Sequence, residues 1–179
     1  MSRTIEILNS IFDHRFIEDS HEAISEPAED MTRDINKGNL SDEDILICRL
    51  DQGSNLRIDL FPYIRDKSHM GLRSMKRICD YAIFVDKDEK LFILLFELKK
   101  GKESPTEQLE VTVPLIEFIF KRAKILKHLD NISYEVRKIG ITDEVGKPTT
   151  AYRGEVVYDD NQFTKLYKSK RIDLRRFLH

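Results

Sequence analysis

The chain has 179 residues, 40% hydrophobic and 35% charged, with a net charge of −2, a composition typical of one soluble domain with a real core. The longest apolar run, residues 91–96, is too short to cross a membrane, and the N-terminus lacks a signal-peptide core, so we expect a cytoplasmic protein without membrane contact. Two cysteines give no disulfide framework, and no paired Cys or His spacing indicates zinc.

The first part of the chain is acidic. Residues 1–45 carry twelve acids and four bases. Residues 18–44 are polar, which favours a loop or a short helix. A helix is predicted over residues 4–14, where apolar residues recur at helical spacing: Ile5, Leu8, Ile11 and Phe12.

Two strands are expected next, over residues 44–51 and 55–63, joined by a hairpin turn at residues 52–55. A connector over residues 64–77 then leads toward the next strand. Its charge is strongly positive, with Asp66 opposed by Arg65, Lys67, Arg73, Lys76 and Arg77.

A buried hairpin is the clearest predicted feature. Residues 78–85 are apolar and β-prone apart from Asp80, residues 86–90 form a polar turn, and residues 91–96 are continuously apolar. An unbroken apolar run indicates a strand that is covered on both faces. A turn centred on Asp88 brings Asp80 beside Glu97.

A long helix is expected after this hairpin. Ser104 is the expected N-cap, Pro105 the first helical residue and Glu107 the partner in a capping box, and the helix should reach about residue 128. Pro114 lies inside the helix and should kink or split it. The residues expected to face inward are Leu115, Ile116, Ile119, Ala123 and Leu126.

Further strands are expected over residues 134–142 and 155–159, and the basic tail is not assigned. The element order predicts a single domain over residues 1–179 of the α/β (α+β) class, with a central mixed β-sheet flanked by helices. Its core is expected over residues 44–142, between an acidic N-terminal region (1–43) and a basic C-terminal extension (143–179). Residues 165–179 carry six bases and one acid, which indicates either a surface for a polyanion or an ordinary solvated face.

Three ionisable side chains are predicted to meet at the end of the hairpin. Glu97 and Lys99 project from one face because side chains alternate along a strand, and the register adds Asp80. Adjacent carboxylates repel each other, and a divalent cation such as magnesium relieves the repulsion. The cation can activate water and stabilise charge on a phosphate, while Lys99 holds the water or contacts the phosphate. These residues therefore favour phosphodiester hydrolysis.

The order Cys79-Asp80, sixteen further residues and then Glu97-Leu98-Lys99 resembles the D…ExK signature of the PD-(D/E)xK, or restriction-endonuclease-like, nuclease superfamily. Gln108-Leu109 in the following helix resembles a QL pair that recurs in several of its branches. The resemblance covers residues 78–109 by motif and residues 1–142 by the element order αβββαβ. Cys79 stands where the motif has proline.

The resemblance implies a magnesium-dependent nuclease, in which manganese can replace magnesium. Asp80, Glu97 and Lys99 would be catalytic, the first two as metal ligands together with the Leu98 carbonyl, and Gln108 would support the site. A DNA endonuclease is favoured over an RNA-cleaving enzyme, and a role in antiviral defence against phage or foreign DNA, with a homodimer or a partner protein, fits the family. A further glutamate that often adds a metal contact has three candidates: Glu22, Glu26 and Glu29.

Basic residues that flank the predicted site are expected to bind the nucleic acid backbone. The acidic N-terminal region should lie elsewhere, because it would repel the substrate. The residues expected to bind phosphates are Arg73, Lys76, Arg77, Lys100 and Lys102.

Other interpretations compete with this one. An ExK triplet occurs often by chance, and Glu97 with Lys99 could be a surface ion pair worth about 0–1 kcal/mol. The chain could be a catalytically inactive nuclease-fold module that binds nucleic acid or a partner protein, or a regulatory protein whose acidic region binds a basic partner. The intact set of three residues favours the nuclease.

Overall fold

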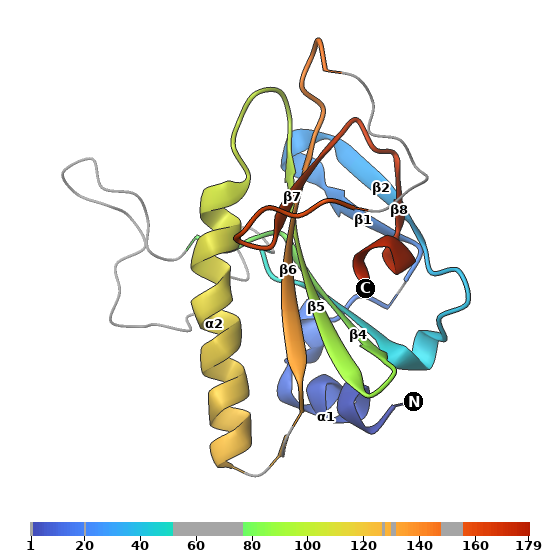
Figure 1. Ribbon diagram of the computed structural model, residues 1–179, viewed down its shortest axis with the longest axis vertical. Coiled ribbons are helices and arrows are strands. Elements are labelled where there is room, and N and C mark those ends of the chain that lie inside the picture. Colours follow the sequence, from blue (N-terminus) through green and yellow to red (C-terminus); the bar gives the residue numbers. More distant parts are fainter. Residues whose placement is uncertain (1, 20, 52–76, 127, 130–131, 148–155) are drawn as a thin grey trace, which may run out of the picture.

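A computed structural model describes residues 2–19, 21–51, 77–126, 128–129, 132–147 and 156–179. The predicted strand over residues 55–63, its turn, and the basic connector up to Lys76 lie outside these residues. The described part has an α+β architecture, with two helices and two mixed β-sheets (Figure 1). Neither helix combines the length and apolarity needed to cross a lipid bilayer.

The larger sheet has five strands in the order β3-β4-β5-β6-β7. The first three are antiparallel neighbours, whereas β5, β6 and β7 run parallel. The predicted strand over residues 134–142 is confirmed. Residues 156–159 form no strand, and the sheet is instead extended from the basic tail. The strands are β3 (Ile45–Arg49), β4 (Tyr81–Lys87), β5 (Lys90–Lys99), β6 (Tyr134–Thr142) and β7 (Phe163–Tyr167).

A second sheet has three strands: β1 (Ala23–Glu26), β2 (Met31–Asn36) and β8 (Arg171–Asp173). β1 pairs with β2 antiparallel, and β2 pairs with β8 parallel. The prediction of loop or short helix for residues 18–44 is therefore wrong. Inward positions of β2 alternate regularly, but Arg33 occupies one of them, buried and paired with Asp143 at 2.7 Å, which breaks the apolar pattern.

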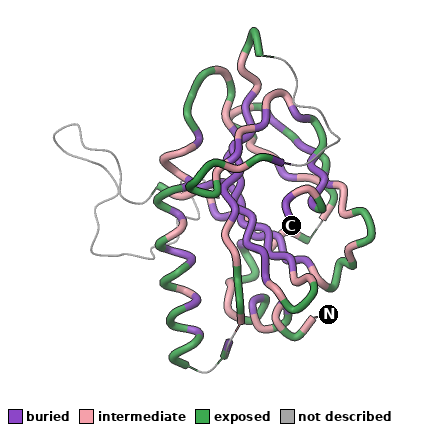
Figure 2. The backbone as a smooth tube through the Cα atoms, in the orientation of Figure 1, coloured by how far each residue is buried: buried purple, intermediate pink, exposed green. Residues whose placement is uncertain are grey.

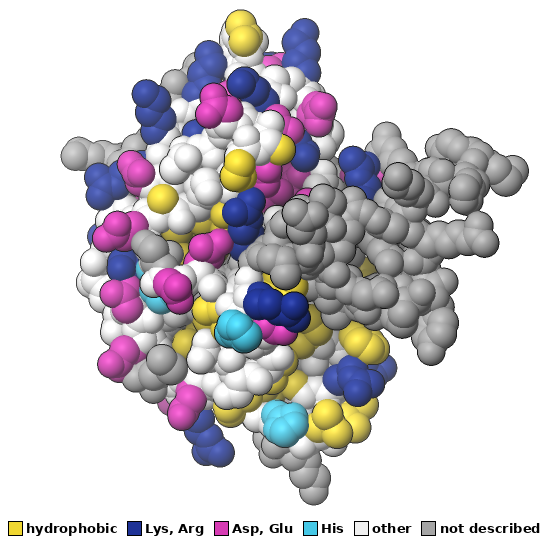
Figure 3. All heavy atoms as spheres, turned by 180° about the vertical axis from the view of Figure 1, so that it is seen from behind, with side chains coloured by type: hydrophobic (Ala, Val, Ile, Leu, Met, Phe, Trp, Pro, Cys, Tyr) yellow, Lys and Arg dark blue, Asp and Glu magenta, His cyan; other side chains and the backbone are white. Residues whose placement is uncertain are grey.

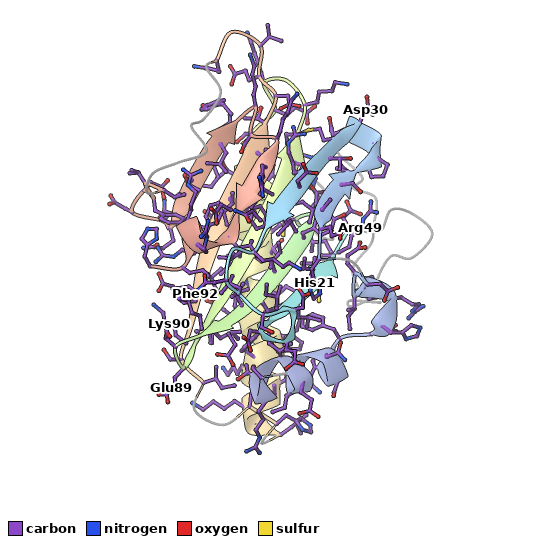
Figure 4. The ribbon with its side chains drawn as sticks, turned by 90° about the vertical axis from the view of Figure 1, so that its right-hand side faces the viewer. His21, Asp30, Arg49, Glu89, Lys90 and Phe92 are labelled. Carbon is purple, nitrogen blue, oxygen red and sulfur yellow. The ribbon has the colours of Figure 1, made fainter. Side chains whose placement is uncertain are left out.

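The two faces of the larger sheet are covered differently. Helices α1 (Arg3–Ile11) and α2 (Thr106–Ile125) pack on one face through one apolar core. The smaller sheet and the 3-10 turn η4 (Leu174–Phe177) cover the other face through a second core, so the small sheet stands in front of the large one with α2 behind it (Figure 4). The expected flanking by helices thus holds for one face alone.

The β4–β5 hairpin is confirmed, and its register differs by one residue from the prediction. Lys87 pairs with Lys90 and Tyr81 with Phe96, so the turn consists of Asp88 and Glu89. Both turn residues have positive φ, at 52° and 61°, as a two-residue turn between twisted strands requires. Continued by one residue, this register sets Asp80 opposite Glu97.

Helix α2 begins one residue later than predicted. Pro105, and not Ser104, is its N-cap, so the predicted N-cap is wrong. Ser104 Oγ still accepts a hydrogen bond from the Thr106 N–H at 3.4 Å, and the Glu107 carboxylate lies 3.5 Å from the Arg77 guanidinium. The helix continues unbroken through Pro114. Leu115, Ile116 and Ala123 face the core as predicted, whereas Leu126 is exposed. The outward side of α2 is exposed along its length (Figure 2).

Candidate functional site

Asp80 and Glu97 form a reciprocal pair at the end of two central strands. Asp80 directly precedes β4, and Glu97 lies near the end of β5. Glu97 Oε2 accepts a hydrogen bond from the Asp80 backbone N–H at 3.1 Å, and Asp80 Oδ2 accepts one from the Leu98 N–H at 2.6 Å. Asp80 is 2% exposed and Glu97 is 0% exposed. The structure therefore brings together the two carboxylates that the register predicted.

Lys99 completes the predicted set of three. Its Nζ lies 2.8 Å from Glu97 Oε1, and its side chain is mostly buried. Glu97 Oε1 is fully buried, and the Lys99 ammonium is its charged partner. A carboxylate oxygen can accept more than one partner, so this contact leaves capacity for a cation.

The electrostatics of the pair are set by burial. Burial, followed by repulsion from Glu97 and a smaller effect of Glu26, raises the pKa of Asp80 well above its usual range. Burial also raises the pKa of Glu97, and it outweighs the opposing ion pair with Lys99. Burial alone would lower the pKa of Lys99, but three acidic neighbours, Glu97 first and then Asp80 and Glu29, raise it overall. The pair therefore tends to retain a proton near neutral pH.

Helix α2 holds the segment that leads into Asp80. The Thr112 hydroxyl accepts a hydrogen bond from the Cys79 N–H at 2.8 Å and donates one to the Gln108 carbonyl at 2.6 Å. Gln108 Nε2 donates to the Ile78 carbonyl at 3.2 Å. Gln108 thus lies where a supporting residue was expected. Thr112 was missed, although a polar residue one turn after Gln108 on the inward helix face was a usable signal.

The acidic N-terminal region approaches the site, contrary to expectation. Glu29 Oε2 accepts a hydrogen bond from the Lys100 N–H at 3.2 Å, and Glu26, whose carboxylate lies 3.9 Å from the Arg49 guanidinium, contributes to the field at Asp80. They come close because the β1–β2 hairpin packs over the sheet and turns at this end. Glu22 lies at the other end of β1. None of the three is on an α-helix, although Glu29 ends the short 3-10 turn η2 (Pro27–Glu29).

The predicted phosphate-binding residues are only partly placed. Lys100 and Lys102 are exposed directly after Lys99. Arg77 lies near the Glu107 carboxylate. Arg73 and Lys76 are outside the described residues.

The basic C-terminal extension reaches the same end of the sheet. Residues at the same level of the sheet lie side by side across β5, β6 and β7. One such row contains Glu97, Gly140 and Lys165, and the next row on the same face contains Lys99, Thr142 and Tyr167. The ammonium groups of Lys165 and Lys147 lie 5.3 Å and 5.9 Å from the centre of the Tyr167 ring.

A glycine in this row lets α2 close on the sheet. A Cβ on Gly140 would lie 2.3 Å from Pro105 Cγ, so Gly140 permits the close approach of the start of α2. That approach keeps Gln108 and Thr112 near Asp80.

Among the described residues, no three His, Cys, Asp or Glu side chains are grouped so as to hold a metal ion. The groups that could bind a metal ion here are the carboxylates of Asp80 and Glu97 and the neighbouring backbone. Cys79 and Cys48 are free and buried, as expected for core cysteines.

Comparisons with known protein families, with curated proteins and with solved structures find no match to the chain. The function must therefore be argued from the site itself.

Proposed function

We propose that the chain is a divalent-metal-dependent nuclease of the PD-(D/E)xK type that hydrolyses phosphodiester bonds, with DNA as the favoured substrate. The observation that carries the proposal is the reciprocal Asp80–Glu97 pair, buried beside Lys99 at the end of two central strands. Two buried carboxylates face one ammonium group. Near neutral pH such a pair either retains a proton or binds a cation, because a second buried carboxylate without a charge partner is unfavourable in a protein interior.

The strand order supports the assignment to this family. Helix α1 is followed by the antiparallel strands β3, β4 and β5, then by α2 and the parallel strand β6. This is the αβββαβ order that the motif implies, with the β1–β2 hairpin inserted after α1 and β7 added at the edge. The aspartate precedes the second core strand and the ExK triplet ends the third, as the motif requires.

The residues fit a small divalent cation. All candidate ligand atoms are oxygens, which magnesium prefers, and Glu97 Oε1 is buried with the Lys99 ammonium as its charged partner. Because a residue's N–H and C=O project to the same side of a strand, the Leu98 carbonyl is directed toward β4 like the N–H that reaches Asp80. Asp80, Glu97 and the Leu98 carbonyl would hold the ion. A bound divalent cation would lower the pKa of its water and stabilise the charge of the phosphate.

The protein's own groups complete the mechanism. Lys99 is held against Glu97, where its ammonium can orient the attacking water or contact a phosphate oxygen. Gln108 and Thr112 fix the backbone before Asp80 and so keep its carboxylate in place. Nearby Glu26 and Asp51 add negative field at the pair, which favours a cation there.

The substrate approaches, in this proposal, from the basic side of the site. Lys100 and Lys102 are exposed beside Lys99, and Lys165 with Tyr167 continues the same rows of the sheet. Glu26 and Glu29 limit the opposite side. Lysines bind the phosphate backbone with little regard to base sequence, so the affinity should fall steeply with salt.

The deciding experiment incubates the purified chain with linear DNA, circular DNA and RNA, in magnesium, in manganese and in excess chelator. Metal-dependent cleavage that is lost in Glu97→Gln and in Lys99→Met supports the proposal. Equal cleavage by wild type and Glu97→Gln would overturn it. The three substrates separate DNA from RNA and internal from terminal cutting.

A second candidate has one observation in its favour. Asp80 Oδ2 and Glu97 Oε2 already accept backbone hydrogen bonds, and Glu97 Oε1 lies against Lys99. Such a network can hold the strands together without an ion, as in an inactive module that binds nucleic acid. Salt-sensitive DNA binding without cleavage, unchanged by Asp80→Asn, would select this alternative.

A further inference from the structure

The aromatic ring of Tyr167 lies at the site end of the sheet, on the face that carries Lys99. Tyr167 ends β7, and the register places it beside Thr142, which in turn lies beside Lys99. Neighbouring strands are about 4.8 Å apart, so the backbones of Tyr167 and Lys99 are separated by about 10 Å. A polymer held at the Asp80–Glu97 pair can therefore extend to the Tyr167 ring.

Two ammonium groups approach this ring from different segments of the chain. Lys165 Nζ lies 5.3 Å from the ring centre, and Lys147 Nζ lies 5.9 Å from it. Lys165 is also 3.8 Å from the Glu144 carboxylate, whereas Lys147 is exposed. An aromatic ring beside lysines is typical of surfaces that bind single-stranded nucleic acid, because the lysines attract phosphates and the ring stacks on bases.

The surface between the site and Tyr167 has room for a phosphate chain. The Thr142 hydroxyl donates a hydrogen bond to the Gly101 carbonyl at 2.7 Å, which holds the start of the β5–α2 loop over the sheet. A Cβ on Gly101 would meet no atom of the described residues within 4 Å. Lys100 and Lys102, on either side of Gly101, are exposed. This end of the sheet is uppermost in Figure 1, and seen from behind it carries numerous Lys and Arg side chains together with several acids (Figure 3).

A base can replace the Lys147 ammonium on the ring. A contact between a cation and a ring at an exposed site is weaker than the stacking of a base on the same ring. The displaced ammonium can then bind a phosphate of the same strand, so the nucleotide gains a stacking contact and a charge contact together.

A duplex cannot make this contact unless it is opened. Its bases are stacked on one another, so a protein ring reaches the face of a base only where the base has left the duplex or is unpaired. The separation of about 10 Å corresponds to about three nucleotides at the duplex rise of about 3.4 Å, and to fewer in an extended strand. The ring therefore selects for unpaired nucleotides close to the site.

We propose that Tyr167 stacks on a base of the bound strand, and that the site therefore takes single-stranded DNA, including the unpaired ends of a duplex. The identity of the substrate rests on the proposed nuclease function. The contact itself does not, because stacking and lysine–phosphate contacts need neither a metal ion nor cleavage.

Fluorescence anisotropy in excess chelator measures the contact without cleavage. A labelled strand of thymidines and a blunt duplex of the same length are each titrated with the chain. Tyr167→Leu should weaken binding of the single strand by about 5- to 100-fold and change duplex binding little, whereas Tyr167→Phe should bind the single strand like wild type. Equal single-strand affinity of wild type and Tyr167→Leu, or an equal loss for both DNAs, overturns the proposal.

Tyr134→Leu is the matched control. Tyr134 is a 37% exposed tyrosine at the opposite end of the sheet, where it begins β6 and pairs with Leu91. Its replacement should leave both DNA affinities unchanged. Far-UV circular dichroism and thermal denaturation establish that each variant is folded.

The salt dependence separates stacking from a structural role of Tyr167. Stacking releases no counterions, so Tyr167→Leu should bind more weakly at every salt concentration with an unchanged slope of log affinity against log salt. Lys147→Ala should reduce the size of that slope by about 0.7, the value for one phosphate contact with a single strand. A reduced slope in Tyr167→Leu would show that the tyrosine only positions the lysines, and it would overturn the proposal.

A photocrosslink locates the base on the unaltered chain. A single strand that contains one 5-iododeoxyuridine is irradiated with wild type in chelator, and the crosslinked peptide is identified by mass spectrometry. The peptide should contain Tyr167. A crosslink confined to other peptides would overturn the proposal.

Failure of this inference and failure of the proposed function give different results. Metal-dependent cleavage that is lost in Glu97→Gln, with equal single-strand binding by wild type and Tyr167→Leu, overturns the stacking contact alone. Single-strand binding that depends on Tyr167, without cleavage in magnesium or manganese, supports the contact and overturns the nuclease.

Discussion

The two ends of the β4–β5 hairpin both carry acids, but the acids at one end are exposed to water and those at the other are buried. At the turn end, Asp86, Asp88 and Glu89 line an open hollow of about 620 Å³ together with Ser2 and Arg175, and the Asp88 side chain is 87% exposed. At the other end, Asp80 and Glu97 are buried. Figure 4 shows Glu89 at the turn and Arg49 of β3 near the opposite end of the sheet, where Arg49 pairs with Tyr81 next to Asp80.

The difference teaches that position in the fold, rather than residue type, creates the candidate site. Water hydrates the carboxylates at the turn end and weakens their mutual repulsion. At the Asp80 end water is largely excluded, so the repulsion is strong and a cation is the natural remedy. Exposed acids at a turn need no further explanation, whereas a buried pair does.

The largest expected effect comes from neutralising carboxylates at each end in turn. Asp80→Asn should abolish cleavage and weaken manganese binding, because it removes a proposed ligand from a dry site. Asp88→Asn and Glu89→Gln should leave both unchanged. Titration with manganese, followed by electron paramagnetic resonance, measures binding without reference to activity. Equal manganese affinity in Asp80→Asn and Asp88→Asn would erase the distinction between the two ends.

A similar contrast applies to the lysines. A Lys100→Ala, Lys102→Ala, Lys165→Ala triple variant should weaken DNA binding and lower the slope of log affinity against log salt by up to about 3, one for each lost phosphate contact. Lys87→Ala at the turn end should change neither quantity. Fluorescence anisotropy at several salt concentrations decides the point, and an unchanged slope in the triple variant would locate the DNA elsewhere.

Thr112 offers a smaller effect that is confined to the buried end. Thr112→Val leaves the Cys79 N–H without its acceptor and should lower the free energy of unfolding by about 1–3 kcal/mol. Thr112→Ser retains the hydroxyl and should recover part of that loss. Urea denaturation measures both variants. Equal stability of the valine and serine variants would show that the hydroxyl contributes little.

A further expected effect is on the pH dependence of stability. The pKa values of Asp80 and Glu97 are raised in the folded chain, so the folded state binds more protons than the unfolded state above about pH 4. The contribution of these groups is complete below that pH and is lost as the pH rises through neutrality. In chelator, the free energy of unfolding of the wild type should therefore fall as the pH increases, relative to that of the Asp80→Asn, Glu97→Gln double variant. Urea denaturation between pH 4 and pH 8 tests the sign, and an opposite trend would contradict the proposed state of the pair.

The site was predictable from sequence because local rules determine it. Strand alternation placed Glu97 and Lys99 on one face, and the turn at Asp88 and Glu89 set Asp80 opposite them to within one residue. Gln108 contacts the Ile78 carbonyl, two residues before Asp80, and its role in supporting the site stays a prediction. Each of these inferences depends only on contacts between residues that are close in the sequence or that face each other across one hairpin.

The rest of the fold depended on contacts between distant segments. β1 and β2 were missed because the inward Arg33 is stabilised by Asp143, more than a hundred residues away. β7 was missed because only two of its positions, Thr164 and Leu166, are buried, and one of these is polar. Lys165 stands between them in a basic stretch of sequence. The approach of Glu29 to Lys100 depends on how this unforeseen hairpin packs, so local patterns could not show it.

The pairing of β2 with β8 has a consequence for the order of folding. Asn36 and Asp173 are 137 residues apart, and Asn36 Nδ2 donates to Asp173 Oδ2. A ribosome makes β2 well before β8, so the small sheet cannot close until residues 171–173 have been made. Until then, Ile24, Met31 and one apolar face of the large sheet lack the cover that Ile172, Leu174 and Phe177 later supply. Long-range pairings of this kind form slowly and leave apolar surface open to chaperones or to aggregation. The nascent chain should therefore be most vulnerable just before residues 171–178 emerge.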